Sequence, residues 1–163
     1  MQENIKIHLA TDHAGFRLKE VIKEYLDEAG YTVVDHGAGS LNEDDDYPDF
    51  IHLAARAVSE DAESVGIILG HSGQGEAMVA NRYPYVRAAV YYGQPREKRK
   101  TKKEGDLLEL TRIDDDANVL SLAAGFLSDE EAIAAVDEWL ATDFSDAMRH
   151  QRRINKIDDN FPG

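Results

Sequence analysis

The residues best suited to chemistry form three short groups in this sequence. The first group is Asp12-His13, which directly follows an apolar segment. A carboxylate and an imidazole at the end of a strand can bind sugar hydroxyls or a phosphate. The same residues also allow a structural interpretation, in which Asp12 caps a helix N-terminus and His13 lies on the surface.

The second group is the glycine-rich segment 70–76, Gly-His-Ser-Gly-Gln-Gly-Glu. Its glycines let successive backbone N–H groups point into one concavity, which suits a phosphate or the oxygen of a developing enediolate. Glu76 is a candidate for moving a proton as a general acid or base. The segment contains no lysine and matches neither the dinucleotide fingerprint nor a Walker motif, so a plain turn between a strand and a helix explains it equally well.

The third group is the run Arg149-His150-Gln151-Arg152-Arg153. On a helix, Arg149 and Arg153 are four residues apart and share one face. Two forked guanidinium groups on one face suit a phosphate. The alternative is a helix whose late cations simply favour its dipole.

Together, the three groups supply the parts that an aldose–ketose phosphate isomerase needs: a phosphate clamp, a concavity for an oxyanion and a carboxylate base. Such a reaction moves one proton between adjacent carbons and two between oxygens. It requires neither a metal nor a redox cofactor, so we expect no metal site and no cofactor.

The elements that must position these groups alternate between strands and helices. Strands are predicted at 5–10, 31–35, 65–69, 86–91 and 118–122, and helices at 15–29, 47–59, 128–141 and 146–158. Gly30 is expected to end the first helix, and Ser128 with Glu131 to form a capping box. This alternation predicts an α/β protein, a Rossmann-like three-layer sandwich with a five-stranded parallel sheet. Ligands of such folds bind beyond the carboxyl ends of the strands, where 11–13 and 70–76 lie.

The sequence is predicted to form a single domain over 1–163. Within it, 94–116 is a charged connection, a divergent basic loop or helix, and 145–158 is a C-terminal helix. The densely basic run 96–103 reads either as a solvated loop or as a surface for a partner or an anion.

Composition excludes several classes of protein. The 163 residues contain no cysteine, which excludes disulfides, thiolate metal sites and a cysteine nucleophile. The net charge of −14 argues against nucleic acid as a partner. Neither a signal peptide nor an apolar run long enough to span a membrane is recognisable, so we expect a cytoplasmic protein that does not bind membranes.

The chain resembles the ribose-5-phosphate isomerase B family, which includes the galactose-6-phosphate isomerase subunits. The resemblance covers nearly the whole length and depends on several motifs in order. These are Ala10-Thr11-Asp12-His13-Ala14-Gly15-Phe16 with Leu18-Lys19, Asp46-Tyr47-Pro48-Asp49-Phe50, Gly73-Gln74-Gly75-Glu76 with Ala80-Asn81-Arg82, Asn118-Val119-Leu120, and the arginine-rich final helix. One branch of the family uses a cysteine base and another a glutamate base; Gly70 replaces that cysteine here, and Glu76 matches the glutamate.

The resemblance implies specific roles for the candidate residues, and homodimers or tetramers with active sites shared across the dimer. The substrate implied is a small phosphorylated sugar. The implied roles are ring opening for Asp12, sugar binding for Ser72, proton transfer between C2 and C1 for Glu76, enediolate binding by the backbone of Gly73 and Gly75, and phosphate binding by His13, Arg149 and Arg153.

Four positions depart from the family pattern. Asp114 and Asp115 replace a His-Asn pair, Gly125 replaces a phosphate-binding arginine, and His71 replaces a glycine. All but His71 are expected in the portion contributed by the partner subunit. We expect Asp114 and Asp115 to bind substrate, and His71 to take over the catalytic role of the missing histidine.

Three hypotheses follow from these departures. The first is a working isomerase that interconverts ribose 5-phosphate and ribulose 5-phosphate, or a related pair. The second is a catalytically impaired sugar-phosphate-binding or scaffold protein of the same fold. The third is a protein-interaction module whose working surface is the basic run 96–103.

Overall fold

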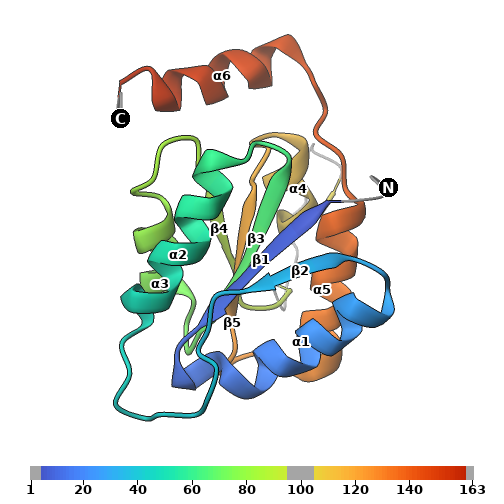
Figure 1. Cartoon of the computed structure of the whole chain (residues 1–163). Coiled ribbons are helices and arrows are strands. Elements are labelled where there is room, and N and C mark those ends of the chain that lie inside the picture. Colours follow the sequence, from blue (N-terminus) through green and yellow to red (C-terminus); the bar gives the residue numbers. More distant parts are fainter. Residues whose placement is uncertain (1–4, 95–104, 161–163) are drawn as a thin grey trace.

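A five-stranded sheet forms the centre of the molecule, as the computed structural model shows for residues 5–94 and 105–160 (Figure 1). The basic run 96–103 lies outside the described residues. All neighbouring strands are parallel, in the order β2-β1-β3-β5-β4. The strands are β1 (Lys6–Thr11), β2 (Thr32–Asp35), β3 (Ser64–Gly70), β4 (Ala88–Tyr91) and β5 (Val119–Ala123). The predicted α/β fold with a five-stranded parallel sheet is therefore confirmed.

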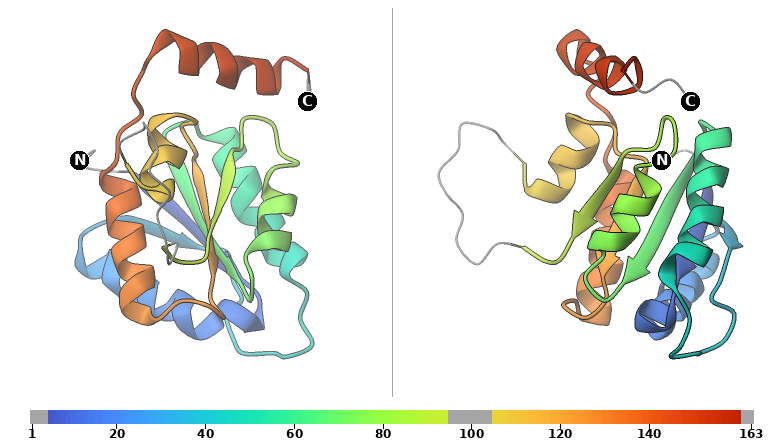
Figure 2. Two further views of the ribbon diagram at one scale, coloured as in Figure 1. Left: turned by 180° about the vertical axis from the view of Figure 1, so that it is seen from behind. Right: turned by 90° about the vertical axis from the view of Figure 1, so that its left-hand side faces the viewer.

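Helices cover both faces of this sheet (Figure 2). Leu9 and Ala10 are neighbours on β1, and their side chains enter two different apolar clusters because side chains alternate along a strand. The cluster of Leu9 contains residues of α1 (Phe16–Glu28), α4 (Leu107–Ile113) and α5 (Asp129–Ala141). The cluster of Ala10 contains residues of α2 (Tyr47–Glu60) and α3 (Gln74–Ala80). None of the helices within 5–94 and 105–160 is long and apolar enough to cross a bilayer.

The chain uses the expected signals to begin and end two of these helices. Ser128 accepts a hydrogen bond from the backbone of Glu131, whose carboxylate accepts one from the backbone of Ser128. Gly30 follows α1 with φ of 86°, a conformation that favours glycine. Strand β4 begins two residues later than predicted because the N–H of Arg87 donates to the Asn118 side chain.

The last helix, α6 (Met148–Asp158), lies apart from the two helical layers, across the amino ends of the strands (Figure 1). It begins two residues later than predicted, after Asp146 with φ of 55°. His150 is its buried residue, whereas Met148 is 85% exposed. The N–H of Tyr85, which precedes β4, donates to Asp158. The arginines of α6 are therefore carried at the amino end of the sheet.

Candidate active site

The carboxyl ends of three adjacent strands bring the first two predicted groups together. Thr11 pairs with Leu69, and Gly70 pairs with Ala123, so that β1, β3 and β5 end side by side. Asp12 follows β1, and segment 71–76 follows β3. Two parts of the sequence about 60 residues apart are thereby joined in one place, as the fold predicts.

Glu76 is the most buried carboxylate of this group. It lies in the first turn of α3 and is 4% exposed. A Cβ at position 70 would overlap the Glu76 carboxylate, so the missing side chain of Gly70 makes the room that this acid occupies. The pKa of Glu76 is raised, mainly by burial and also by the charge of Asp12. A hydrogen bond from a backbone N–H and the charge of His71 act in the opposite direction. A raised pKa suits a group that must both take and return a proton.

His13 is held by an acid from the loop before α2. Asp45 Oδ1 accepts hydrogen bonds from the His13 backbone at 2.9 Å and lies 2.7 Å from His13 Nδ1. The hydrogen bond to Asp45 raises the pKa of His13, and the charge of Asp12 acts in the same direction. A cationic imidazole is suited to an anion such as phosphate. Asp12, His13 and Asp45 each have a ligand atom close enough to share one cation, although two of these atoms already bond to each other.

Asp12 has both of the predicted roles open to it. Its Oδ1 accepts a hydrogen bond from the Ala14 backbone at 2.9 Å and so caps the short 3₁₀ helix η1 (His13–Gly15). Its Oδ2 lies 3.9 Å from His13 Nδ1. The structural interpretation of this residue holds, and the charge of Asp12 also acts on Glu76.

The turn between β3 and α3 depends on Gly73. Its φ of 72° and its close approach to Leu122 both favour glycine. Ser121 Oγ donates to the Gly73 carbonyl at 2.7 Å, which fixes the turn to β5. Ser72 Oγ accepts a 3.4 Å hydrogen bond from the backbone of Gln74. Ser72 and the backbone of this turn thus belong to the segment that leads directly into Glu76.

His71 and Gly125 are in direct contact at the same end of the sheet. The backbone N–H of Gly125 donates to the carbonyl of His71 at 3.0 Å, and the His71 ring packs against Phe126 with centroids 5.5 Å apart. Within the chain, Gly125 therefore lies beside His71, and the expected contribution of this position to the site of a partner subunit stays a prediction. Asp114 and Asp115 do not share this location.

Asp114 and Asp115 lie before β5, at the amino end of the sheet. Asp114 Oδ1 is 3.4 Å from Nε2 of the buried His150, where it helps to hold the start of α6. The carbonyl of Asp115 accepts a hydrogen bond from Arg87 Nε at 3.1 Å. The Asp114 side chain therefore has a contact within the chain, whereas the contact of Asp115 is made by its backbone and its side chain is exposed.

Arg149 and Arg153 belong to α6, which lies at the amino end of the sheet (Figures 1 and 2), whereas Glu76 belongs to the first turn of α3, which follows the carboxyl end of β3. One chain by itself does not bring these arginines to Asp12, His71 and Glu76. A site that uses all of the predicted residues requires a second copy of the chain.

Two polar residues beside the site were not singled out as candidates from the sequence. Asp45 belongs to the acidic loop 42–46, and Tyr47 is part of the motif 46–50. The signal that could have indicated both residues is their position at the end of the loop that leads into α2. Loops at the carboxyl edge of the sheet often carry binding residues.

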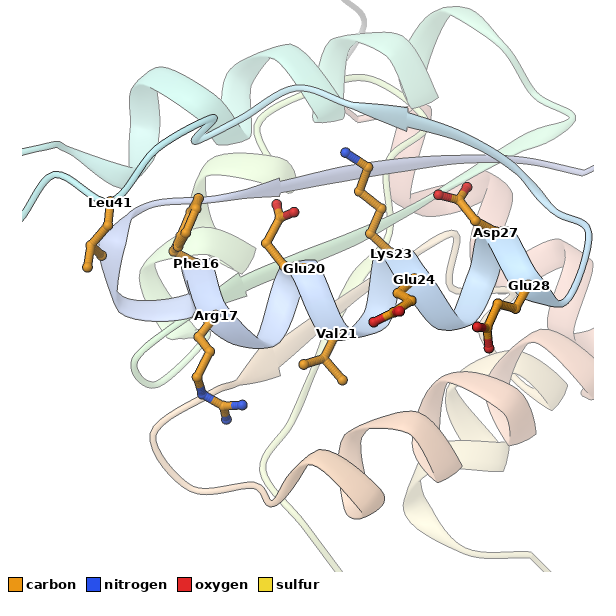
Figure 3. Close-up of a pocket in the computed structure, with 9 residues that line it drawn as sticks. All are labelled: Phe16, Arg17, Glu20, Val21, Lys23, Glu24, Asp27, Glu28 and Leu41. Carbon is orange, nitrogen blue, oxygen red and sulfur yellow. The ribbon is translucent and has the colours of Figure 1, made fainter.

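A surface groove runs along α1 and is lined by nine residues that do not include any of the candidates (Figure 3). One of its charged residues already has a partner, because Arg17 donates to the Asp129 carboxylate through both terminal guanidinium nitrogens, at 2.9 and 2.7 Å. The group around Glu76 is therefore the better candidate for chemistry.

Known proteins are similar to this chain in sequence and in fold. The sequence model of the ribose/galactose isomerase family matches residues 7–157. Ribose-5-phosphate isomerase B of Mycolicibacterium paratuberculosis is 36% identical over 151 residues, which cover 93% of this chain and 88% of that protein. Ribose-5-phosphate isomerase B of Mycoplasma genitalium, solved with bound ribulose-5-phosphate, superposes with a TM-score of 0.85 at 36% identity and 96% and 95% coverage. The enzyme of Thermotoga maritima superposes with a TM-score of 0.83 at 37% identity and 95% and 98% coverage. This chain belongs to the ribose/galactose isomerase family.

Proposed function

We propose that this protein interconverts ribose 5-phosphate and ribulose 5-phosphate through an enediolate, with Glu76 as the proton shuttle. The observation that carries the proposal is the buried Glu76 carboxylate over Gly70, in the electrostatic range of both Asp12 and His71. The names of the similar proteins support the same reaction.

In the proposed reaction, Asp12 assists opening of the sugar ring. Glu76 then removes the proton from C2 of the aldose, a C1=C2 double bond forms, and O1 becomes negatively charged. A proton passes from O2 to O1, and Glu76 returns its proton to C1, which leaves the ketose carbonyl at C2. The backbone N–H groups of Gly73 and Gly75 stabilise the negative oxygen, because fixed dipoles act strongly where charge develops.

His71 is proposed to assist the proton transfers between oxygens. Its ring lies beside Phe126, and its effect on the charge of Glu76 places it within electrostatic reach of the base. An imidazole has one nitrogen that can donate a proton and one that can accept a proton, which suits this role. No additional metal or redox group takes part in this scheme.

The phosphate is proposed to bind His13 of one copy and the two α6 arginines of another. Arg149 and Arg153 are exposed and share a face of α6, and His13 carries a raised pKa through its bond to Asp45. This arrangement makes a homodimer the smallest active unit. It also explains why α6 lies apart from the layers of its own chain.

A second candidate is a protein that binds the sugar phosphate without turning it over. The observation that favours it is the contact between Asp114 and the buried His150, which commits one of the two replaced family positions to packing. A coupled assay of ribose 5-phosphate conversion, run beside Glu76→Gln, separates the two functions. Turnover that the variant abolishes supports the isomerase, whereas calorimetric binding without turnover supports the second candidate.

A further inference from the structure

The ring of Tyr47 packs at the edge of the candidate site and so holds the side chain in place. Tyr47 is the first residue of α2, is followed by Pro48 in the first turn, and packs against the apolar cluster of α2 and α3. A proline in this position presets the backbone of the first turn. The ring therefore has little freedom to move its hydroxyl away.

The Tyr47 hydroxyl lies over the backbone of Gly75. A Cβ on Gly75 would stand 2.6 Å from Oη and 2.7 Å from Cζ of Tyr47. Gly75 is the residue before the proposed base, so the hydroxyl occupies space immediately beside the turn that leads into Glu76. The missing side chain of Gly75 is what admits it.

This hydroxyl also lacks a hydrogen-bond partner among the residues that the structure describes. Two other tyrosines differ in this respect: Tyr25 Oη donates to Asp137 at 2.9 Å, and Tyr83 Oη lies 2.9 Å from His52 Nδ1. Tyr47 is only partly buried, so its side chain can be reached by a ligand as well as by water. A ligand that enters the site would supply a hydrogen-bond partner.

The neighbours of Tyr47 indicate which part of a ligand its hydroxyl would bind. Two residues earlier, Asp45 holds His13, the proposed phosphate ligand, and Gly75 on the other side precedes Glu76, the proposed base. We propose that the Tyr47 hydroxyl binds a sugar hydroxyl between the reacting carbons and the phosphate, at C3 or C4, and so selects the substrate. This inference rests on the proposed function.

The test compares wild-type protein and Tyr47→Phe on ribose 5-phosphate and on its 3-deoxy and 4-deoxy analogues. The variant is expected to lower kcat/KM for ribose 5-phosphate by about 3- to 10-fold, and to have no further effect on the analogue that lacks the bound hydroxyl. Equal losses on all three compounds, or no loss on any, would overturn the inference, since a purely structural role does not distinguish them.

Tyr83→Phe is the matched control, because it removes a hydroxyl that His52 already binds outside the site. It should leave the discrimination among the three compounds unchanged. The same comparison is made by calorimetric binding with Glu76→Gln as the background. If Tyr47→Phe weakens binding of ribose 5-phosphate more than binding of one analogue, but the wild type shows no turnover, the role of Tyr47 is supported and the isomerase function is overturned. If the wild type turns over and the variant affects all three compounds equally, only the role of Tyr47 is overturned.

Discussion

The imidazole of His71 occupies the place where a side chain at position 125 would begin. A Cβ on Gly125 would overlap Cε1 and Nδ1 of His71. Positions 71 and 125 are therefore physically linked: the glycine at 125 allows the histidine at 71 to take its observed orientation beside Phe126.

His71→Ala is expected to lower kcat by about 100-fold or more, because a lost general acid–base group typically costs this much. Gly125→Ala should also lower kcat, since the new methyl group displaces the ring. The double variant should be no slower than His71→Ala, because there is then no ring to displace. Near-normal kinetics in His71→Ala would remove His71 from the catalytic group. Steady-state kinetics and circular dichroism of all three variants provide the measurement.

Glu76→Gln is expected to lower kcat by at least about 100-fold and to raise the melting temperature. The second effect follows from the sign of the pKa shift. Since burial raises the pKa of Glu76 in the folded state, the folded protein carries a charge at neutral pH that is more favourable in the unfolded chain. The neutral amide removes that cost.

Glu24→Gln on the exposed surface of α1 is the matched control and should change neither quantity. A lower melting temperature in Glu76→Gln would show that the carboxylate makes compensating contacts. In the wild type, kcat/KM should fall with decreasing pH earlier than an ordinary glutamate would cause, because the base must be ionised before it accepts the C2 proton.

Mixing two inactive variants should restore activity if the site is shared between copies. A hybrid of Glu76→Gln and the double variant Arg149→Ala/Arg153→Ala has one site in which all three residues are intact. Random exchange of subunits then gives about a quarter of the wild-type activity. The two proteins are mixed by co-refolding, and the coupled assay is repeated.

A mixture of Glu76→Gln with Asp12→Asn is the control, because both changes affect the same side of the site and each hybrid site retains one of them. Absence of recovery in the first mixture, with hybrids formed, would exclude the shared arrangement.

The stability of the protein should decrease as the pH falls from 6.5 to about 4, in part because of His8. This side chain is 5% exposed, and its Nδ1 lies 2.9 Å from Nε2 of His36. Burial lowers the pKa of His8 to about 4, and the charges of His36 and Lys6 act in the same direction. Between these pH values the unfolded chain binds a proton that the folded chain does not, so the free energy of unfolding falls by up to about 3 kcal/mol.

Urea unfolding at pH 7.5 and pH 5 measures this decrease. His8→Gln should show a smaller decrease than the wild type, while His52→Gln on the outer surface of α2 should match it. An equal decrease in His8→Gln and the wild type would mean that other groups cause the acid sensitivity.

The fold was predictable because its signals are local. The continuous apolar run of β3 is typical of a strand buried on both faces, and all seven of its residues are buried. The capping box at Ser128 and the glycine after α1 also depend on residues close together in sequence. Strand alternation then fixed the end of the sheet at which Asp12 and Glu76 meet.

Contacts between distant residues were not predictable in the same way. The overlap of His71 with a side chain at position 125 and the bond from Asp45 to His13 depend on how loops pass one another, which no short pattern encodes. The location of α6 was not predictable either. The spacing of its arginines predicts that they share a face of the helix, but it does not predict the end of the sheet at which the helix lies.

The space above Gly70 has a consequence for how the protein can change over generations. The acid at position 76 fills the volume that any larger residue at 70 would need, and a thiol there would meet the carboxylate directly. A larger residue at position 70 therefore requires the Glu76 carboxylate to leave its observed place. A library that varies position 70 alone should yield fewer functional members than one that varies positions 70 and 76 together.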